Sequence, residues 1–300
     1  MLLKNEFSWS KSRDELFKEC KRKYYFDKYG FWNGWNQDSE ERTKKLYQLK
    51  QLSPKQVWLG KIVHESIEHF LTELKLGNTI PLPTLLSILQ QELESRYHSS
   101  ELGVYRTFPK KGGLLEHELK TNITEEEKQQ LFKLAETCVT HFYHSNLLKE
   151  IKELKHDAWL SLEDFLSFDF EGTKIYLSMD FAVKNKDTIV IYDWKTGKDQ
   201  DTEIGIQLAC YALYAIQTWK INPQQIVIKR YHLAIDKENE FRIDETTIHQ
   251  TKEIIRQSIK EMKNSLSNPE QNLAEEINFP QTQDTWKCLR CNFRRVCNLV

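Results

Sequence analysis

The sequence predicts an α/β protein whose mixed central sheet is flanked by helices. Residues 158–170 alternate between apolar and polar side chains, and further strand-like runs follow at 175–180 and 188–195. A short polar turn joins the last two runs, so we expect them to pair antiparallel. A helix at about 203–219 then leads to a strand at 225–234. Because a strand–helix–strand crossover joins parallel strands, the sheet should contain both kinds of pairing.

Helices precede and follow this sheet. Ser12 and Glu15 form a capping-box pattern, which predicts a helix that ends near Gly30. The composition from Trp32 to Lys50 is polar and irregular, and indicates a loop or a short helix. Apolar residues recur at helical spacing in four longer segments, at about 53–76, 83–98, 124–155 and 245–266.

The length of 300 residues suits one large domain, with three parts in chain order. We expect a helical N-terminal part at about 10–155, a sheet core at about 156–235, and a C-terminal helix with its tail at about 244–300. The helices of the first part are additions to the sheet core.

Composition limits the range of functions. The chain carries 43 Lys and Arg against 44 Asp and Glu, so any contact with nucleic acid must come from a local basic patch. No apolar run approaches the length of a membrane span, and the first residues lack the features of a signal peptide. We therefore expect a cytoplasmic location and no membrane partner. In that compartment six cysteines are not read as three disulfides.

Acidic and basic side chains interrupt the predicted hairpin. Asp193 and Lys195 are two residues apart on one strand, so their side chains share a face. Counting back through the turn places Asp180 opposite Asp193. A surface hairpin with solvated charges would show the same pattern. Glu163, an acid in the middle of the preceding strand, belongs either to this cluster or to the solvent face.

Such a cluster favours a particular chemistry. Neighbouring carboxylates bind Mg²⁺ or Mn²⁺, and a bound metal can polarise a phosphodiester and activate water. Lys195 would stabilise negative charge in the transition state. No Walker-type phosphate loop is present in the sequence. His64 lies beside the apolar stripe of the 53–76 helix; on this pattern alone, a half-buried structural histidine is the commoner interpretation.

The C-terminal tail carries a metal-binding pattern. Cys288, Cys291 and Cys297 have the spacing C-x2-C-x5-C, which in a cytosolic chain indicates a metal site. Three thiolates need a fourth ligand. Cys138 and Cys210 lie on apolar helix faces and have the pattern of core thiols. The best remaining candidate is Cys20, although a small core residue is also a common role for a lone cysteine.

These motifs together resemble a known family. The pattern Asp180…Asp193-x-Lys195 resembles the core of the PD-(D/E)xK nucleases. Gly60-x-x-x-His64 and Gln207-x-x-x-Tyr211 resemble motifs of the RecB-like branch of that superfamily. The resemblance implies a restriction-endonuclease-like fold. One position departs from the family pattern: Leu177 stands where glycine is common.

The resemblance also implies roles for individual residues. In the family the histidine and both acids bind metal, here His64, Asp180 and Asp193. The main-chain carbonyl after the second acid, here that of Trp194, completes the metal shell. The lysine, here Lys195, is catalytic. The residues that correspond to Gln207 and Tyr211 support the site and contact DNA.

The cysteine pattern is similar to that of the iron–sulfur members, such as the AddB nuclease domain and the CRISPR-associated adaptation nucleases. In those proteins a 4Fe–4S cluster ties the N-terminal helix to the C-terminal tail, here through Cys20, Cys288, Cys291 and Cys297. Four thiolates also suit Zn²⁺, so spacing alone leaves zinc as an alternative.

Basic and aromatic residues surround the four cysteines. They form either a strand-binding patch or a solvated rim. The candidate DNA contacts are Arg22, Lys198, Arg290, Arg294 and Arg295, with Lys21, Lys23, Trp286 and Phe293 beside them.

The sequence therefore predicts a metal-dependent DNA nuclease. The family implies exonuclease action on single-stranded or frayed DNA. The near-neutral net charge suggests that a protein partner in a repair, CRISPR or other defence complex helps to hold the DNA. The first alternative is a non-catalytic nucleic-acid-binding subunit with a nuclease-like fold. A second is a zinc-stabilised interaction module that does not bind DNA.

Overall fold

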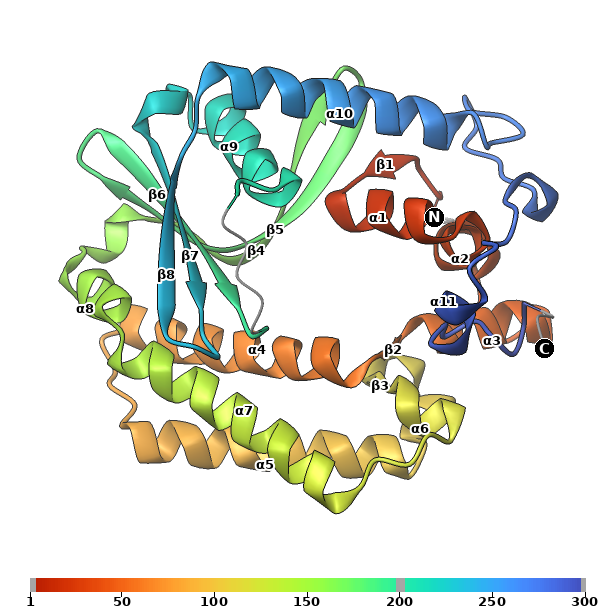
Figure 1. The fold of residues 1–300 in the computed structure, drawn as a ribbon, viewed down its shortest axis with the longest axis horizontal. Coiled ribbons are helices and arrows are strands. Elements are labelled where there is room, and N and C mark those ends of the chain that lie inside the picture. Colours follow the sequence, from red (N-terminus) through yellow and green to blue (C-terminus); the bar gives the residue numbers. More distant parts are fainter. Residues whose placement is uncertain (1–3, 198–202, 298–300) are drawn as a thin grey trace.

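The computed structural model describes residues 4–197 and 203–297 (Figure 1). Its main sheet is mixed and six-stranded, with the strand order β1-β5-β6-β7-β8 and with β4 paired to β5. The prediction of a mixed central sheet flanked by helices is confirmed. The strands are β1 (Ser8–Trp9), β4 (Trp159–Phe170), β5 (Thr173–Asn185), β6 (Thr188–Lys195), β7 (Ile226–His232) and β8 (Lys237–Arg242).

The predicted hairpin and crossover are both present. β5 and β6 pair antiparallel, with Phe181 opposite Tyr192 and Asn185 opposite Thr188. β6 and β7 pair parallel, and helix α9 (Ile206–Thr218) connects them. α9 is apolar on almost every face because it lies between the sheet and helix α10 (Glu245–Lys263).

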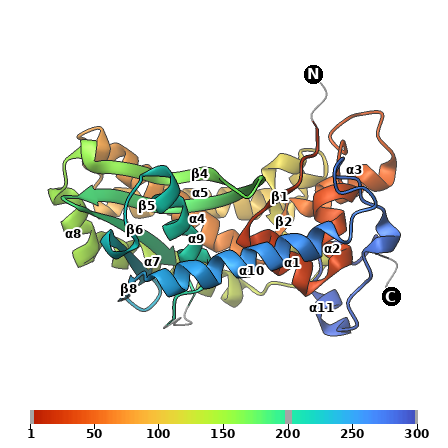
Figure 2. The same cartoon turned by 90° about the horizontal axis from the view of Figure 1, so that it is seen from above.

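Helices cover both faces of the sheet (Figures 1 and 2). One face carries a core in which Phe181, Tyr192 and Trp194 pack against the N-terminal helices. The other face packs against α9 and α10 through a second apolar cluster. The helices of the first face are α4 (Lys55–Lys75), α5 (Leu82–Glu101), α7 (Glu125–His144) and α8 (Asn146–Glu153).

The N-terminal segment differs from the single helix that was predicted. Ser10, not Ser12, caps the helix α1 (Lys11–Glu19), because its hydroxyl accepts the hydrogen bond from the backbone N–H of Arg13. Cys20 is extended and ends α1. The chain resumes as α2 (Lys21–Tyr25) and the π-helix η1 (Phe26–Gly30).

The predicted helix at 124–155 is also two helices. Thr124 and Glu127 form the expected capping box at the start of α7. Ser145 is extended and its hydroxyl accepts a hydrogen bond from the backbone N–H of Leu148, so it begins α8. A serine that caps a new helix therefore divides an otherwise continuous apolar pattern.

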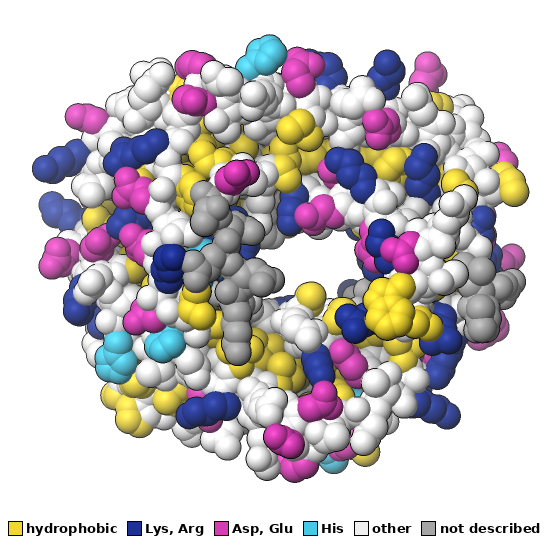
Figure 3. Space-filling model, in the orientation of Figure 1, with side chains coloured by type: hydrophobic (Ala, Val, Ile, Leu, Met, Phe, Trp, Pro, Cys, Tyr) yellow, Lys and Arg dark blue, Asp and Glu magenta, His cyan; other side chains and the backbone are white. Residues whose placement is uncertain are grey.

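The segment of α2 and η1 lies beside the C-terminal tail, across the molecule from strands β6, β7 and β8 (Figure 1). Phe26 and Phe293 are in contact, with ring centroids 5.5 Å apart, in a third apolar cluster. Figure 3 shows an opening through the centre of the molecule, between the sheet on one side and these terminal segments on the other.

The remaining elements are α3 (Glu41–Lys50), β2 (Leu52–Ser53), η2 (Val104–Arg106), η3 (Pro109–Lys111), β3 (Gly113–Leu114), α6 (Leu115–Leu119), η4 (His156–Ala158), η5 (Pro223–Gln225), η6 (Glu276–Asn278) and α11 (Thr285–Leu289).

One edge of β5 is only partly paired. β4 pairs with β5 along residues 173–183. β1 pairs with residues 174–175 and β6 with residues 181–185, and both must use the edge that β4 leaves free. Residues 176–180 therefore form a gap in the sheet between β1 and β6, where the described strands leave this edge of β5 unpaired. Asp180 lies at one end of this gap.

Candidate functional site

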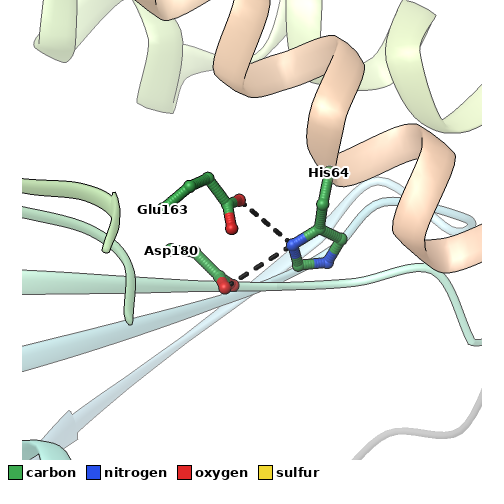
Figure 4. Close-up of side chains that lie close together, drawn as sticks. All are labelled: His64, Glu163 and Asp180. Atoms are coloured by element: carbon green, nitrogen blue, oxygen red, sulfur yellow. Dashed lines mark hydrogen bonds and ion pairs between the residues drawn. The ribbon is translucent and has the colours of Figure 1, made fainter. Parts of the chain in front are cut away.

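His64, Glu163 and Asp180 come together from three different elements, α4, β4 and β5 (Figure 4). His64 Nδ1 lies 3.1 Å from Glu163 Oε1 and 3.5 Å from Asp180 Oδ1. One possible ligand atom from each residue lies within 4.8 Å of the other two. Two carboxylates and one imidazole are donors that Mg²⁺ and Mn²⁺ accept. The group therefore fits a divalent cation.

The local backbone explains how Glu163 joins this group. The register of β4 and β5 pairs Leu162 with Phe181 and Asp164 with Met179, so Glu163 lies opposite Asp180. Glu163 has φ of 48°, in the left-handed region that few residues other than glycine adopt. The carboxylate of Asp164 stabilises this bend by accepting the backbone N–H of Leu162 at 3.2 Å.

The carboxylates determine the charge of the histidine. Burial alone lowers the pKa of His64, but the nearby charges of Asp180 and Glu163 outweigh burial and raise this pKa to about 10. Burial raises the pKa of Glu163. A proton on His64 therefore compensates the carboxylates, and a bound divalent cation would supply the same compensation.

Asp193 and Lys195 form a second group, on the side of the sheet that α9 covers. The Lys195 ammonium donates hydrogen bonds to Asp193 Oδ1 at 3.0 Å and to Gln207 Oε1 at 3.2 Å. The Tyr211 hydroxyl donates to Asp193 Oδ1 at 3.4 Å and accepts from the Gln207 amide at 2.6 Å. The structure thus joins four of the residues from the predicted motifs, Asp193, Lys195, Gln207 and Tyr211, in one network.

Arg230 is a partner of this network that the sequence interpretation missed. It lies on β7 opposite Asp193, and its Nε donates to Asp193 Oδ2 at 2.8 Å. Both side chains are buried. An arginine in the middle of the apolar strand 226–232 was the available signal, because a buried arginine almost always pairs with an acid.

Trp194 lies between Asp193 and Lys195 on β6 and links this second group to the first. Its N–H donates to Asp180 Oδ2 at 2.8 Å, and its indole N–H donates to Glu163 Oε1 at 3.3 Å. Asp193 is not among the residues whose ligand atoms lie within 4.8 Å of one another. The compact group therefore differs from the predicted set, because Glu163 takes part in it while Asp193 pairs with Arg230. Ligation by Asp193 and by the Trp194 carbonyl stays a prediction.

Gly60 allows α4 to approach the end of β6. A Cβ atom at this position would lie 3.2 Å from Thr196 Oγ1, closer than most real contacts. His64 is one helical turn further along α4, so the same approach places its ring at the carboxylates. This is a physical reason for glycine in the motif Gly60-x-x-x-His64.

A pocket of about 480 Å³ opens beside the second group, at the gap in the sheet. Gln207 and Tyr211 form one wall, and the N-terminal part of α1 forms another. Phe165 and Tyr176 lie on its rim with their rings stacked 4.9 Å apart, and Phe165 is 71% exposed. The pocket also has three basic residues in its lining, Lys11, Arg13 and Lys28.

The four cysteines that were predicted to act together line one small pocket where the chain ends meet. Cys20 comes from the start of α2, and Cys288, Cys291 and Cys297 come from the tail. The backbone N–H of Arg22 donates to the carbonyl of Pro280 at 3.1 Å, which holds the two segments together.

Cys138 and Cys210 are buried in the cores, and burial raises the pKa of each thiol to about 12. These two residues therefore have the environment of core thiols.

The predicted DNA contacts are placed unequally. Arg22 forms an ion pair with Glu276 at 2.8 Å, and Arg295 lies 3.5 Å from the buried Glu118, so both have structural partners. The Arg290 guanidinium lies over the exposed ring of Trp286. Arg294 lines the cysteine pocket. Lys198 lies outside the described residues.

The fold and the site define a class of protein. A mixed sheet that carries acids and a lysine beside a carboxylate–histidine group suits metal-assisted chemistry on a phosphodiester. The match to a family model is consistent with this: residues 8–298 match the model of the PD-(D/E)XK nuclease superfamily, and the chain belongs to that superfamily. No curated protein matches the sequence. Within the described residues, no helix is both long and apolar enough to cross a membrane.

Proposed function

We propose that the protein is a metal-dependent deoxyribonuclease of the RecB-like branch, which acts on single-stranded or frayed DNA ends. The observation that supports this most is the position of Lys195 between Asp193 and Gln207, together with the His64–Glu163–Asp180 group that α4, β4 and β5 bring together. Acids and a lysine in this arrangement suit the hydrolysis of a phosphodiester.

The metal would be Mg²⁺ or Mn²⁺, held by His64, Asp180 and Glu163. Asp193 and the main-chain carbonyl of Trp194 are the remaining ligands that the family pattern suggests. When bound, the cation supplies charge that polarises the phosphodiester and lowers the pKa of water. The orientation of Asp180 is already fixed by the backbone N–H of Trp194, which reduces the reorganisation that binding needs.

The side chains of the second group have separate tasks. The Lys195 side chain is 32% exposed, so its ammonium can contact a substrate while Asp193 holds it. It would stabilise the negative charge that develops on the phosphate oxygens. Gln207 and Tyr211 position Lys195 and Asp193 through the hydrogen bonds described above. Gln207 is partly exposed beside the pocket and can contact the strand, whereas Tyr211 is buried and supports the site from within.

The preference for single strands is supported by the pocket at the sheet gap. The stacked rings of Phe165 and Tyr176 offer a surface for an unpaired base, and the nearby basic residues offer contacts for phosphates. The central opening supports action on ends, because a linear strand can be threaded through a closed ring whereas a closed circle cannot.

The group held by the cysteine pocket would be a 4Fe–4S cluster, as the resemblance to the iron–sulfur members suggests. Four thiolates from Cys20, Cys288, Cys291 and Cys297 also suit Zn²⁺, which is the alternative. Visible absorbance and acid-labile sulfide would identify a cluster, while zinc would give neither.

The alternative function is a non-catalytic nucleic-acid-binding subunit of a repair, CRISPR or other defence complex. One observation favours it: Arg230 pairs with Asp193 and so competes with a metal for the second acid. In this alternative the chain binds DNA but does not cleave it.

The test is a cleavage assay with Mg²⁺ or Mn²⁺ on end-labelled DNA, single- and double-stranded, linear and circular. Asp193→Asn and Lys195→Ala should abolish cleavage. Asp187→Asn, in the turn before β6, and Lys184→Ala, near the end of β5, change exposed residues and are matched controls that should cleave like the wild type. Cleavage of linear but not circular strands supports end-dependent action. Binding without cleavage by the cluster-loaded wild type would support the alternative instead.

A further inference from the structure

A large groove lies apart from the site, at α3 and the segment 106–111. Its volume is about 960 Å³. α3 lies across the central opening from the sheet (Figure 1). None of the residues that line this groove belongs to the motifs of the nuclease site. Its charged lining is strongly basic, with one acid, Glu41, against five basic residues: Lys44, Lys45, Arg106, Lys110 and Lys111.

Buried acid compensates part of this charge. Glu118 lies beneath the groove, is 2% exposed, and pairs with Lys45 at 2.9 Å and with Arg106 at 3.4 Å. In contrast, Lys110 and Lys111 are exposed and make no salt bridge within the part of the chain that the structure describes. The excess charge therefore lies on the rim of the groove, where it is open to a ligand.

Aromatic rings accompany the rim lysines. Phe108 is 61% exposed, directly before Pro109 and the two lysines. Trp35 is 38% exposed on the facing segment, and its ring contacts Tyr47 with centroids 5.8 Å apart. An exposed phenylalanine beside unpaired lysines contributes nothing to the core. Such a surface is typical of sites where bases stack and phosphates meet cations.

We propose that this groove is a second binding site, which holds a single strand of nucleic acid away from the cleavage centre. Phe108 and Trp35 would stack on bases, and Lys110 and Lys111 would contact phosphates. The proposal deepens the proposed function, because it assigns the strand beyond the cleaved end to a place on the same chain. An acidic protein segment would use the lysines but would not need two exposed rings, so the observations favour the nucleic acid.

The experiment measures binding without divalent metal and cleavage with it, on DNA strands of about 30 and about 6 nucleotides. The variants are Phe108→Ala and Lys110→Glu/Lys111→Glu. Matched controls are Ile277→Ala, which is 80% exposed elsewhere, and Lys252→Glu/Lys260→Glu on the exposed face of α10. Because Phe108, Lys110 and Lys111 are exposed, we expect the variants to fold, which their melting temperatures will check.

Each groove variant should weaken binding of the long strand about tenfold and leave cleavage of the short strand unchanged. In the lysine double variant, a plot of the logarithm of the DNA-binding constant against the logarithm of the salt concentration should be less steep by about 1.4. This is the value for two lost phosphate contacts on a single strand. The control variants should bind the long strand and cleave the short strand as the wild type does.

Long-strand affinity equal to the wild type in both groove variants would overturn the proposal, whether or not the protein cleaves. Reduced affinity for an acidic peptide but not for DNA would overturn it in favour of a protein ligand. If the wild type binds long strands through the groove but cleaves nothing, the nuclease proposal fails and the groove proposal stands.

Discussion

The cysteine pocket joins segments that are far apart in the sequence, and this gives a prediction of stability. Cys20 is the one member that comes from the N-terminal segment. If a cluster binds all four thiols, it closes a loop from residue 20 to residue 288. By the loop-entropy relation for cross-links, such a closure stabilises the fold by on the order of 5 kcal/mol. In a chain of this length, that corresponds to a loss of about 10 °C in melting temperature when the link is removed.

The variant Cys20→Ser isolates this effect. Cys20 caps α2 by accepting the backbone N–H of Lys23, and serine keeps that hydrogen bond. Melting temperature by circular dichroism, visible absorbance and iron content would be compared in anaerobically purified protein. Cys138→Ala is the control, because it removes a thiol from the core without touching the pocket; it should cost about 1 kcal/mol and keep the absorbance. If Cys20→Ser has the same melting temperature and the same iron content as the wild type, the reasoning is refuted.

Three further predictions test other parts of the molecule. Glu163→Gln should weaken Mn²⁺ binding by about tenfold or more by calorimetry, and unchanged affinity would exclude Glu163 as a ligand. Gly34→Ala should lower the free energy of unfolding by about 1–3 kcal/mol, because its Cβ would lie 2.5 Å from the Thr43 carbonyl oxygen; Gly197→Ala, with open space around it, is the control. Burial raises the pKa of Glu118, but hydrogen bonds from Lys45 and Tyr105 outweigh it and hold this pKa below its usual value. The stabilisation by Glu118 is therefore present above about pH 4.3 and is lost as the pH falls through the lowered pKa. Glu118→Gln should make the free energy of unfolding, measured with urea, depend less steeply on pH on the acid side. An unchanged pH dependence would contradict this.

The sequence predicted those parts of the fold that depend on local pattern. Alternation and the polar turn located β5 and β6 and their antiparallel pairing. The apolar helix between two strands predicted the parallel pairing of β6 with β7. Spacing along α9 correctly placed Gln207 and Tyr211 on one face. In each case the information lies within a few residues, so no distant contact was needed.

The parts that the sequence did not predict depend on distant partners. β1 is two residues long and exists because it pairs with β5. β8 is charged and mostly exposed, since it is an edge strand that pairs with β7 alone. The role of Glu163 depends on its left-handed backbone, and the role of Arg230 depends on the strand register. The β5–β6 register could be counted through the short turn, but the parallel register of β6 and β7 and the backbone conformation of Glu163 leave no clear mark in one sequence.

The pairing of the N-terminal segment with late parts of the chain has a consequence for synthesis on the ribosome. Trp9 donates its indole N–H to Ser258, which in turn donates to Asp14, so β1 and α1 have partners on α10. At ordinary elongation rates, α10 is translated on the order of tens of seconds after β1. During that interval Trp9 and Asp14 lack their partner on α10, and α1 can pack only on nearby segments such as α2. β1 and α1 therefore reach their full native contacts only after α10 has left the exit tunnel.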